Sequence, residues 1–121
     1  MAFSISKQQV LTGAPVGNVD SSGNVETRGA MVMGKIDVTS YTNGGEVVPA
    51  GAFGLNEVYG VVFNGAESDT YAVRSFEIAA GNKSGTLNVD SAGSGTEVSS
   101  TTDIGEFHFM AWGEMLGSGS N

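Results

Sequence analysis

Glycine content is the feature that most limits what this chain can fold into. The 121 residues include nineteen glycines, spread among many Ser, Thr and Asn residues. Glycine inside a helix costs about 1 kcal/mol relative to alanine, and Ser, Thr and Asn favour caps and turns. We find no long window in which apolar residues recur at helical spacing. The sequence therefore predicts an all-β protein, built as a single small β-sandwich or barrel-like domain.

Charge and cysteine content exclude several kinds of partner and site. Thirteen acidic residues face five lysines and arginines, which gives a net charge of -8. Because phosphate binding needs clustered Lys and Arg, and those five are scattered, we expect no nucleic-acid partner. The acidic balance, the short apolar runs and the absence of a secretory signal pattern also argue against a membrane partner. Without cysteine, disulfides, zinc–thiolate sites and thiol catalysis are excluded.

Alternating apolar residues predict a series of strands. The clearest covers residues 30–38, where Ala30, Val32 and Ile36 share one face and Met31 and Met33 begin the other. Further strands are predicted at 58–63, 70–79, 86–90 and 104–112, separated by polar or glycine-rich turns. Because both faces of 58–63 are apolar, we expect that strand in the centre of a sheet, ending in a turn at 64–65. Strict alternation is expected along 70–79.

The residues before position 29 lack a regular pattern. Phe3, Ile5, Val10 and Leu11 are isolated among Gly, Ser, Asn and Gln. This segment is either a loosely ordered terminus or an extended arm that docks on a neighbouring subunit, and its apolar residues favour the arm. We therefore divide the chain into an N-terminal arm (1–28), a β-domain (29–116) and a flexible tail (117–121).

The stretch from Ser40 to Glu46 joins the first two strong strands. Asn43-Gly44-Gly45 permits the positive φ that a tight reversal needs. The residues that follow, 49–55, predict one helical turn or an irregular loop, with Phe53 and Leu55 held in the core. Together these features favour a structural corner between two strands.

The same stretch resembles a group of small virion proteins of tailed bacteriophages, of the capsid decoration (cement) type. The similarity covers residues 29–63 and consists of a Ser-Tyr-x-x-Gly-Gly-Glu segment after an apolar strand and a later Gly-Leu-x-x-Val step. The matching positions are Ser40, Tyr41, Gly44, Gly45, Glu46, Gly54, Leu55 and Val58.

The resemblance implies a non-enzymatic structural protein without cofactors. It implies a β-rich domain that binds the major capsid protein on the outer surface of the shell and stabilises it, as a homo-oligomer and often a trimer. The protein would lie in the host cytoplasm before assembly and on the virion afterwards. A small tail or head-fibre component and a carbohydrate-binding β-sandwich are the alternatives, and the last needs an exposed aromatic platform, for which Trp112 and Tyr41 are the candidates.

Residues that could support catalysis or metal binding are sparse. His108 is the only histidine, and Glu106 precedes it by two residues on the same strand face. We expect a polar surface contact there rather than a general base. No pair of acidic residues is marked out for glycoside hydrolysis, and the stretch 93–95 lacks the Lys of a phosphate loop. The stretches 20–24 and 67–69 could offer oxygen ligands to calcium but fit turn chemistry better.

A set of methionines and the single tryptophan is more informative. Met31, Met33, Met110, Trp112 and Met115 either fill the core or lie at a subunit or capsid contact, because Met and Trp suit both places. The predicted contact residues are Phe3, Ile5, Val10, Leu11, Met31, Met33, Tyr41, Met110 and Trp112.

Overall fold

A computed structural model of the chain describes residues 3–12, 18–19, 22–23, 25–26 and 29–115. The elements in order are β1 (Phe3–Thr12), β2 (Asn18–Val19), β3 (Val25–Glu26), β4 (Gly29–Val38), β5 (Glu46–Pro49), the 3-10 turn η1 (Ala50–Phe53), β6 (Leu55–Ala66), β7 (Tyr71–Ile78), β8 (Ser84–Ser91) and β9 (Gly105–Met115). Within this part of the chain, no helix is long and apolar enough to cross a membrane.

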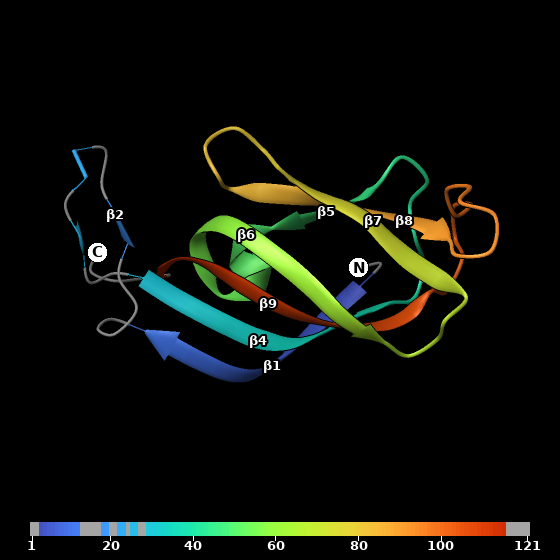
Figure 1. Cartoon of the computed structure of the whole chain (residues 1–121), viewed down its shortest axis with the longest axis horizontal. Coiled ribbons are helices and arrows are strands. Elements are labelled where there is room, and N and C mark those ends of the chain that lie inside the picture. The colour runs from blue at the N-terminus through green and yellow to red at the C-terminus, as the bar shows by residue number, and fades with distance from the viewer. Residues whose placement is uncertain (1–2, 13–17, 20–21, 24, 27–28, 116–121) are drawn as a thin grey trace.

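Two antiparallel sheets pack against each other, so the predicted all-β sandwich is confirmed (Figure 1). The larger sheet has the strand order β1-β4-β9-β6, and the smaller has the order β5-β8-β7. Figure 1 shows the smaller sheet above the larger one, with the short β2–β3 ladder at one end of the sandwich. Alternate residues of each sheet point into the space between them, where the core forms.

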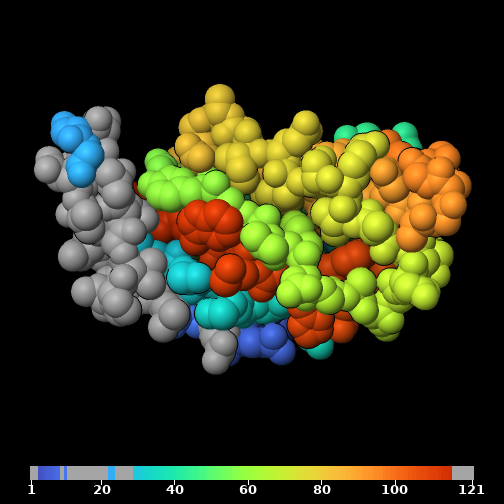
Figure 2. Space-filling view, in the orientation of Figure 1, coloured from blue at the N-terminus to red at the C-terminus, as the bar shows by residue number. Residues whose placement is uncertain are grey.

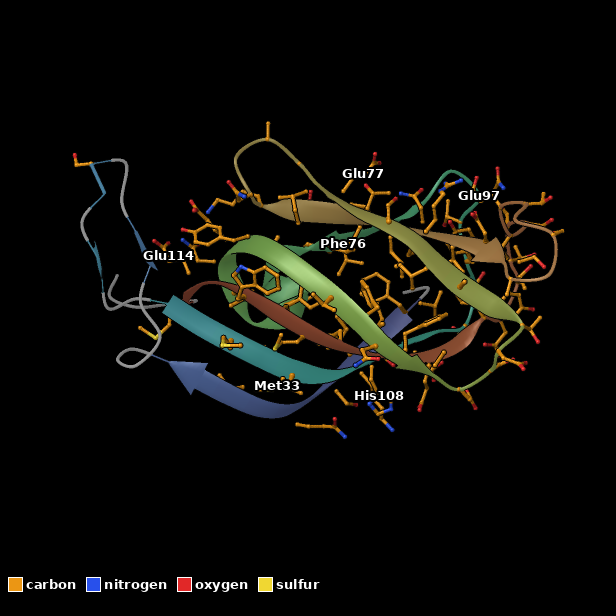
Figure 3. The ribbon with its side chains drawn as sticks, viewed as in Figure 1. Met33, Phe76, Glu77, Glu97, His108 and Glu114 are labelled. Carbon is orange, nitrogen blue, oxygen red and sulfur yellow. The ribbon has the colours of Figure 1, made fainter. Side chains whose placement is uncertain are left out.

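The core joins the two sheets through aromatic contacts. Phe53 of η1 packs edge-on against Phe109 of β9 and Phe76 of β7, with ring centroids 5.1 and 5.8 Å apart. Figure 3 shows Phe76 between the sheets, whereas the neighbouring Glu77 points away. Phe53 and Leu55 are fully buried, as the sequence predicted.

Strict alternation is confirmed in β4 and β9. Ala30, Val32, Ile36 and Val38 of β4 are buried, whereas Met31, Met33, Lys35 and Asp37 on the opposite face are partly exposed. Phe107, Phe109 and Ala111 of β9 are buried in the same way. These two strands are the centre of the larger sheet.

The N-terminal segment differs from the expected arm. Residues 3–12 form β1, which pairs with β4 from Phe3 opposite Val38 to Thr12 opposite Ala30. Phe3 is buried in this chain's own core, and Ile5 packs against that core. The β-domain therefore begins at Phe3 rather than at residue 29. Most of the rest of the expected arm, and the tail at 117–121, lie outside the described residues.

Strand β6 is longer than the strand predicted at 58–63, and it occupies a different place in the sheet. It lies at an edge of the larger sheet, where β9 is its one partner among the described strands, so the prediction of a central strand was wrong. Asn64 and Gly65 do not end it, because β6 continues to Ala66 through one of its three irregularities in register. Irregularities of this kind increase the local twist of a strand and bend it.

A bulge also breaks the alternation of β7. The register shifts between Val73 and Ser75. Tyr71 and Val73 pack against the core before the bulge, and Phe76 and Ile78 do so after it. The expected strict alternation, which set Phe76 opposite Val73, was therefore wrong.

Candidate contact face and its supporting corner

The corner between β4 and β5 is held by one buried tyrosine. Tyr41 is 1% exposed, and its hydroxyl accepts a hydrogen bond from the Val89 amide at 3.0 Å. The same hydroxyl donates to Glu97 Oε2 at 2.8 Å. The Tyr41 amide donates to the Thr102 carbonyl, and the Thr101 amide donates to the Tyr41 carbonyl. One residue thus ties the corner to β8 and to the loop before β9.

Glycines let the chain reverse beside that tyrosine. Gly44 and Gly45 have φ values of 100° and 117°, which side chains rarely adopt. A Cβ on Gly45 would also lie 2.2 Å from Thr86 Cγ2. The Gly44 amide donates to Glu97 Oε2 at 2.7 Å, and Glu46 accepts a bond from the Thr42 amide at 3.1 Å. The Ser-Tyr-x-x-Gly-Gly-Glu segment is therefore a structural corner, as expected.

Ionisation at the corner follows from these contacts. Burial, followed by the Glu97 carboxylate, raises the pKa of Tyr41 to about 12. Hydrogen bonds from the Tyr41 hydroxyl and the Gly44 amide lower the pKa of Glu97. Both shifts mean that a neutral Tyr41 hydroxyl donates its hydrogen bond to an ionised Glu97. Tyr41 is therefore a buried anchor, and its prediction as a contact residue was wrong.

The larger sheet carries an apolar patch on the side away from the core. Met31 of β4 lies opposite Trp112 of β9, and Met33 lies opposite Met110. Val62 of β6 pairs with Met110 and extends the second row. Trp112 and Val62 are 37% and 47% exposed, and the three methionines are partly exposed. We call these five residues the apolar face.

The apolar face is an outer surface and not part of the core, so the core-filling alternative for Met31, Met33, Met110 and Trp112 is excluded. Figure 2 shows atoms of β4, β9 and β6, in cyan, red and green, side by side on the visible side. Met115, by contrast, packs against the core. An exposed patch of this kind in a small domain commonly marks an interaction site.

A glycine of β6 seats the tryptophan. Gly60 lies opposite Trp112 in the register. A Cβ on Gly60 would lie 2.3 Å from Trp112 Cζ2 and within 3 Å of two further indole atoms, so the ring lies directly over this glycine. The sequence offered no signal for the pairing of Gly60 with Trp112, because it joins residues of two distant segments. The missing side chain leaves room for the indole ring of Trp112 to lie against β6.

Carboxylates lie at both ends of the apolar face. Glu57 and Glu114 are opposite each other at one end, with Lys83 Nζ 4.0 Å from Glu57. At the other end Asp37 lies opposite Glu106. The labelled Glu114, Met33 and His108 in Figure 3 follow one another along the sheet. We call these the first and second acidic ends.

The second acidic end is the more crowded. Burial raises the pKa of Asp37, and Glu106 is the strongest of the negative neighbours that raise it further. Asp103 and Glu67 add to this repulsion. Lys35 acts in the opposite direction and lowers the pKa of Asp37. Its Nζ also lies 3.4 Å from Glu106 Oε2.

The other predicted contact residues are distributed over the domain. Phe3 is buried in the core, so its prediction as a contact residue was wrong, and Ile5 is half-buried. Val10 is 51% exposed on β1. The side chain of Leu11 lies outside the described part of the structure. The apolar face therefore keeps four of the nine predicted residues together and adds Val62.

The candidate chemical groups are arranged as surface and turn residues. His108 is exposed on β9 opposite Lys35, and Glu106 pairs with that lysine. Glu67 Oε1 accepts a bond from the Glu106 amide, and Ser68 Oγ accepts one from the Thr70 amide. The described residues include no group of three or more His, Cys, Asp or Glu suited to a metal ion. Most of the stretch 20–24 lies outside the description.

A small hollow opens at the edge of the sandwich between β6 and β7. Its volume is about 140 Å³, and Phe63, Tyr71, Val73 and Phe107 line much of it. A hollow of this size can hold a group as large as benzene.

Comparisons of the chain with protein-family models, with curated proteins and with solved structures found no match.

Proposed function

We propose that this protein is a non-enzymatic structural protein of a tailed-phage virion, which binds the outer surface of the capsid and stabilises it. The observation that carries the proposal is the apolar face: Met31, Met33, Val62, Met110 and Trp112 on an open sheet of an otherwise acidic domain. Adaptable methionines around one seated tryptophan are typical of a protein contact.

The resemblance at Ser40–Glu46 supplies the virion context. It implies that the partner is the major capsid protein and that several copies act together, with a trimer as the favoured state. Weak contacts made by linked copies add through effective concentration, so each apolar face needs only modest affinity. The mechanism is adhesive: a rigid sandwich presents the face, and several copies bridge neighbouring capsid subunits.

The direct test mixes purified protein with expanded capsids that were assembled without it. We expect binding at a fixed stoichiometry and a higher melting temperature of the shell. Capsids already carrying the protein are the matched control and should take up none. Absence of binding to the empty sites would contradict the proposal and move it to a tail or head-fibre component.

Carbohydrate binding is the second candidate, favoured by the indole of Trp112 lying over Gly60. The other expected platform residue, Tyr41, is buried and cannot serve. Tight binding in a glycan screen that is lost on Trp112→Ala would replace the capsid proposal.

A further inference from the structure

We propose that Lys83 and Asn56 form a covalent isopeptide link, in which the lysine amine replaces the side-chain amide nitrogen of the asparagine. The link joins the turn between β7 and β8 of the smaller sheet to β6 of the larger sheet. It is a property of the free chain, so it stands or falls separately from capsid binding.

The lysine amine lies beside the carbonyl groups of the asparagine. Lys83 Nζ donates to Asn56 Oδ1 at 3.3 Å and to the Asn56 backbone carbonyl at 3.2 Å. The two residues are 27 positions apart, so the fold brings them together. The carbon that carries Oδ1, Cγ, is the atom that an amine attacks when it displaces an amide nitrogen. Holding the two groups in contact turns an encounter between molecules into a step within one chain.

Backbone hydrogen bonds hold the lysine in this position. The Val58 amide donates to the Asn82 carbonyl at 2.8 Å, and Asn82 Nδ2 donates to the Val58 carbonyl at 3.0 Å. The Ala50 amide donates to the Lys83 carbonyl at 2.8 Å. The backbone is therefore fixed on both sides of Lys83, and only the side chain has to move for the reaction.

A bulge in β6 places Asn56 beside two carboxylates. The register shifts between Leu55 and Glu57, so Asn56 is the extra residue next to the pair of Glu57 and Glu114. Leu55 and Val58 point into the core, whereas residues 56 and 57 are both partly exposed. Bulges re-aim side chains in this way, and here the result is that an amide and two carboxylates share one side of the sheet.

Each carboxylate lies near one of the two nitrogen atoms that exchange. Glu57 Oε2 is 4.0 Å from Lys83 Nζ, and Glu114 Oε1 accepts a hydrogen bond from Asn56 Nδ2 at 2.5 Å. Glu57 is therefore placed to remove a proton from the attacking amine, and Glu114 is placed to deliver one to the departing nitrogen.

The exchange balances without an oxidant, a reductant or a co-reactant. The lone pair of the neutral Lys83 amine forms a bond to Asn56 Cγ, and the bond from Cγ to Nδ2 breaks. One proton leaves Nζ by way of Glu57 and one reaches Nδ2 by way of Glu114, so the two carboxyl groups hold the same total number of protons before and after. The amide nitrogen leaves as ammonia, and the chain loses the mass of one ammonia molecule.

The link closes a long loop between the two sheets. A covalent cross-link stabilises a fold by restricting the unfolded chain, as a disulfide does. The chain has no cysteine and therefore no disulfide. The isopeptide link supplies a cross-link that does not depend on a redox environment.

Mass spectrometry of the free protein, before and after incubation at neutral and alkaline pH, tests the link. Because the amine attacks in its neutral form, we expect ammonia loss to be faster at alkaline pH, and peptide mapping to find a branched peptide that joins residues 56 and 83. Lys83→Arg keeps the charge but removes the nucleophile, so it should form no branched peptide. Lys35→Arg, at the other lysine–glutamate pair, is the matched control and should react like the wild type. Glu114→Gln should slow the reaction by about tenfold or more.

A second readout keeps the link separate from other losses of ammonia. Ring closure at Asn43-Gly44 or Asn64-Gly65 releases the same mass, but peptide mapping places it at those positions and it persists in Lys83→Arg. The linked wild type should also melt at a higher temperature than Lys83→Arg, whose fold circular dichroism confirms. Folded wild-type protein without the branched peptide after days at alkaline pH would overturn the inference, as would an equal loss of ammonia in Lys83→Arg.

Discussion

At the residue scale, Tyr41 connects segments that are far apart in the chain. Its hydroxyl bonds reach Val89 and Glu97, and its backbone bonds reach Thr101 and Thr102. A buried hydroxyl with two partners stabilises a fold mainly because its removal leaves those partners unsatisfied. The corner is therefore sensitive to a change of a single atom.

Tyr41→Phe should lower the free energy of unfolding by about 1–3 kcal/mol, because the Val89 amide loses its buried acceptor. Urea unfolding measures the change. Tyr59→Phe is the matched control, since Tyr59 is 39% exposed, and should change stability by less than about 0.5 kcal/mol. Equal effects of the two variants would contradict the role of Tyr41.

Alkaline pH should weaken the same contact. The pKa of Tyr41 in the fold is about 12, above its ordinary value of 10.0. A raised folded pKa means that this stabilisation is fully present below pH 10 and is lost as the pH rises toward 12. Unfolding free energy should fall more steeply above pH 10 in the wild type than in Tyr41→Phe. Parallel curves would count against the buried, neutral hydroxyl.

Acidic pH should remove the stability that Glu97 contributes. Its pKa is lowered from 4.5 by bonds from Tyr41 and Gly44. The contribution is present above pH 4.5 and is lost as the pH falls through the folded pKa. Glu97→Gln should therefore be less stable than the wild type at pH 7, with the difference shrinking toward pH 3. A difference that does not depend on pH would show that the Glu97 charge is not involved.

At the scale of elements, β1 decides whether the N-terminus is an arm or part of the domain. Its pairing with β4 and the burial of Phe3 place it in the sandwich. Removing its core side chain should therefore affect folding itself, and not only assembly.

Phe3→Ala should lower the free energy of unfolding by about 3 kcal/mol, which is typical of a buried phenylalanine. Val10→Ala, on the same strand but 51% exposed, is the control and should have little effect. Urea unfolding of the free protein distinguishes the two. An unchanged unfolding midpoint for Phe3→Ala would restore the view of residues 3–12 as a detachable arm.

Regular alternation explains which strands could be predicted from the sequence. β4 and β9 alternate without interruption, so their buried and outer faces could be assigned residue by residue. In β1 the register shift between Lys7 and Gln9 separates Phe3 and Ile5 from Val10, and the pattern is lost. β6 misled the prediction because Val62 is apolar yet 47% exposed.

The candidate site was predictable only in part, because alternation within one strand does not show which residues of another strand lie beside it. The shared outer face of Met110 and Trp112 follows from local alternation. The seat at Gly60 and the acidic end at Glu57 depend on how β6 pairs with β9. Cross-strand register between distant segments is a long-range property that local sequence does not encode.

At the scale of the whole molecule, the sandwich separates stability from contact. The core lies between the sheets, and Tyr41 ties the corner to β8 and to Glu97, whereas the apolar face points outward. Changes on that face should therefore alter binding far more than folding. The outer side of the smaller sheet carries no such role in binding. Val47, which is exposed on β5 of that sheet, therefore serves as the comparison for Trp112.

The most direct measurement is the binding of Trp112→Ala to capsids, set against its own free energy of unfolding. We expect affinity to fall by more than about tenfold, as for an interface hot spot, while stability falls by about 1 kcal/mol or less. Val47→Ala, which shortens an exposed side chain of the other sheet, should change neither. Equal losses of binding and stability in Trp112→Ala, or full binding without the indole, would contradict the apolar face as the contact surface.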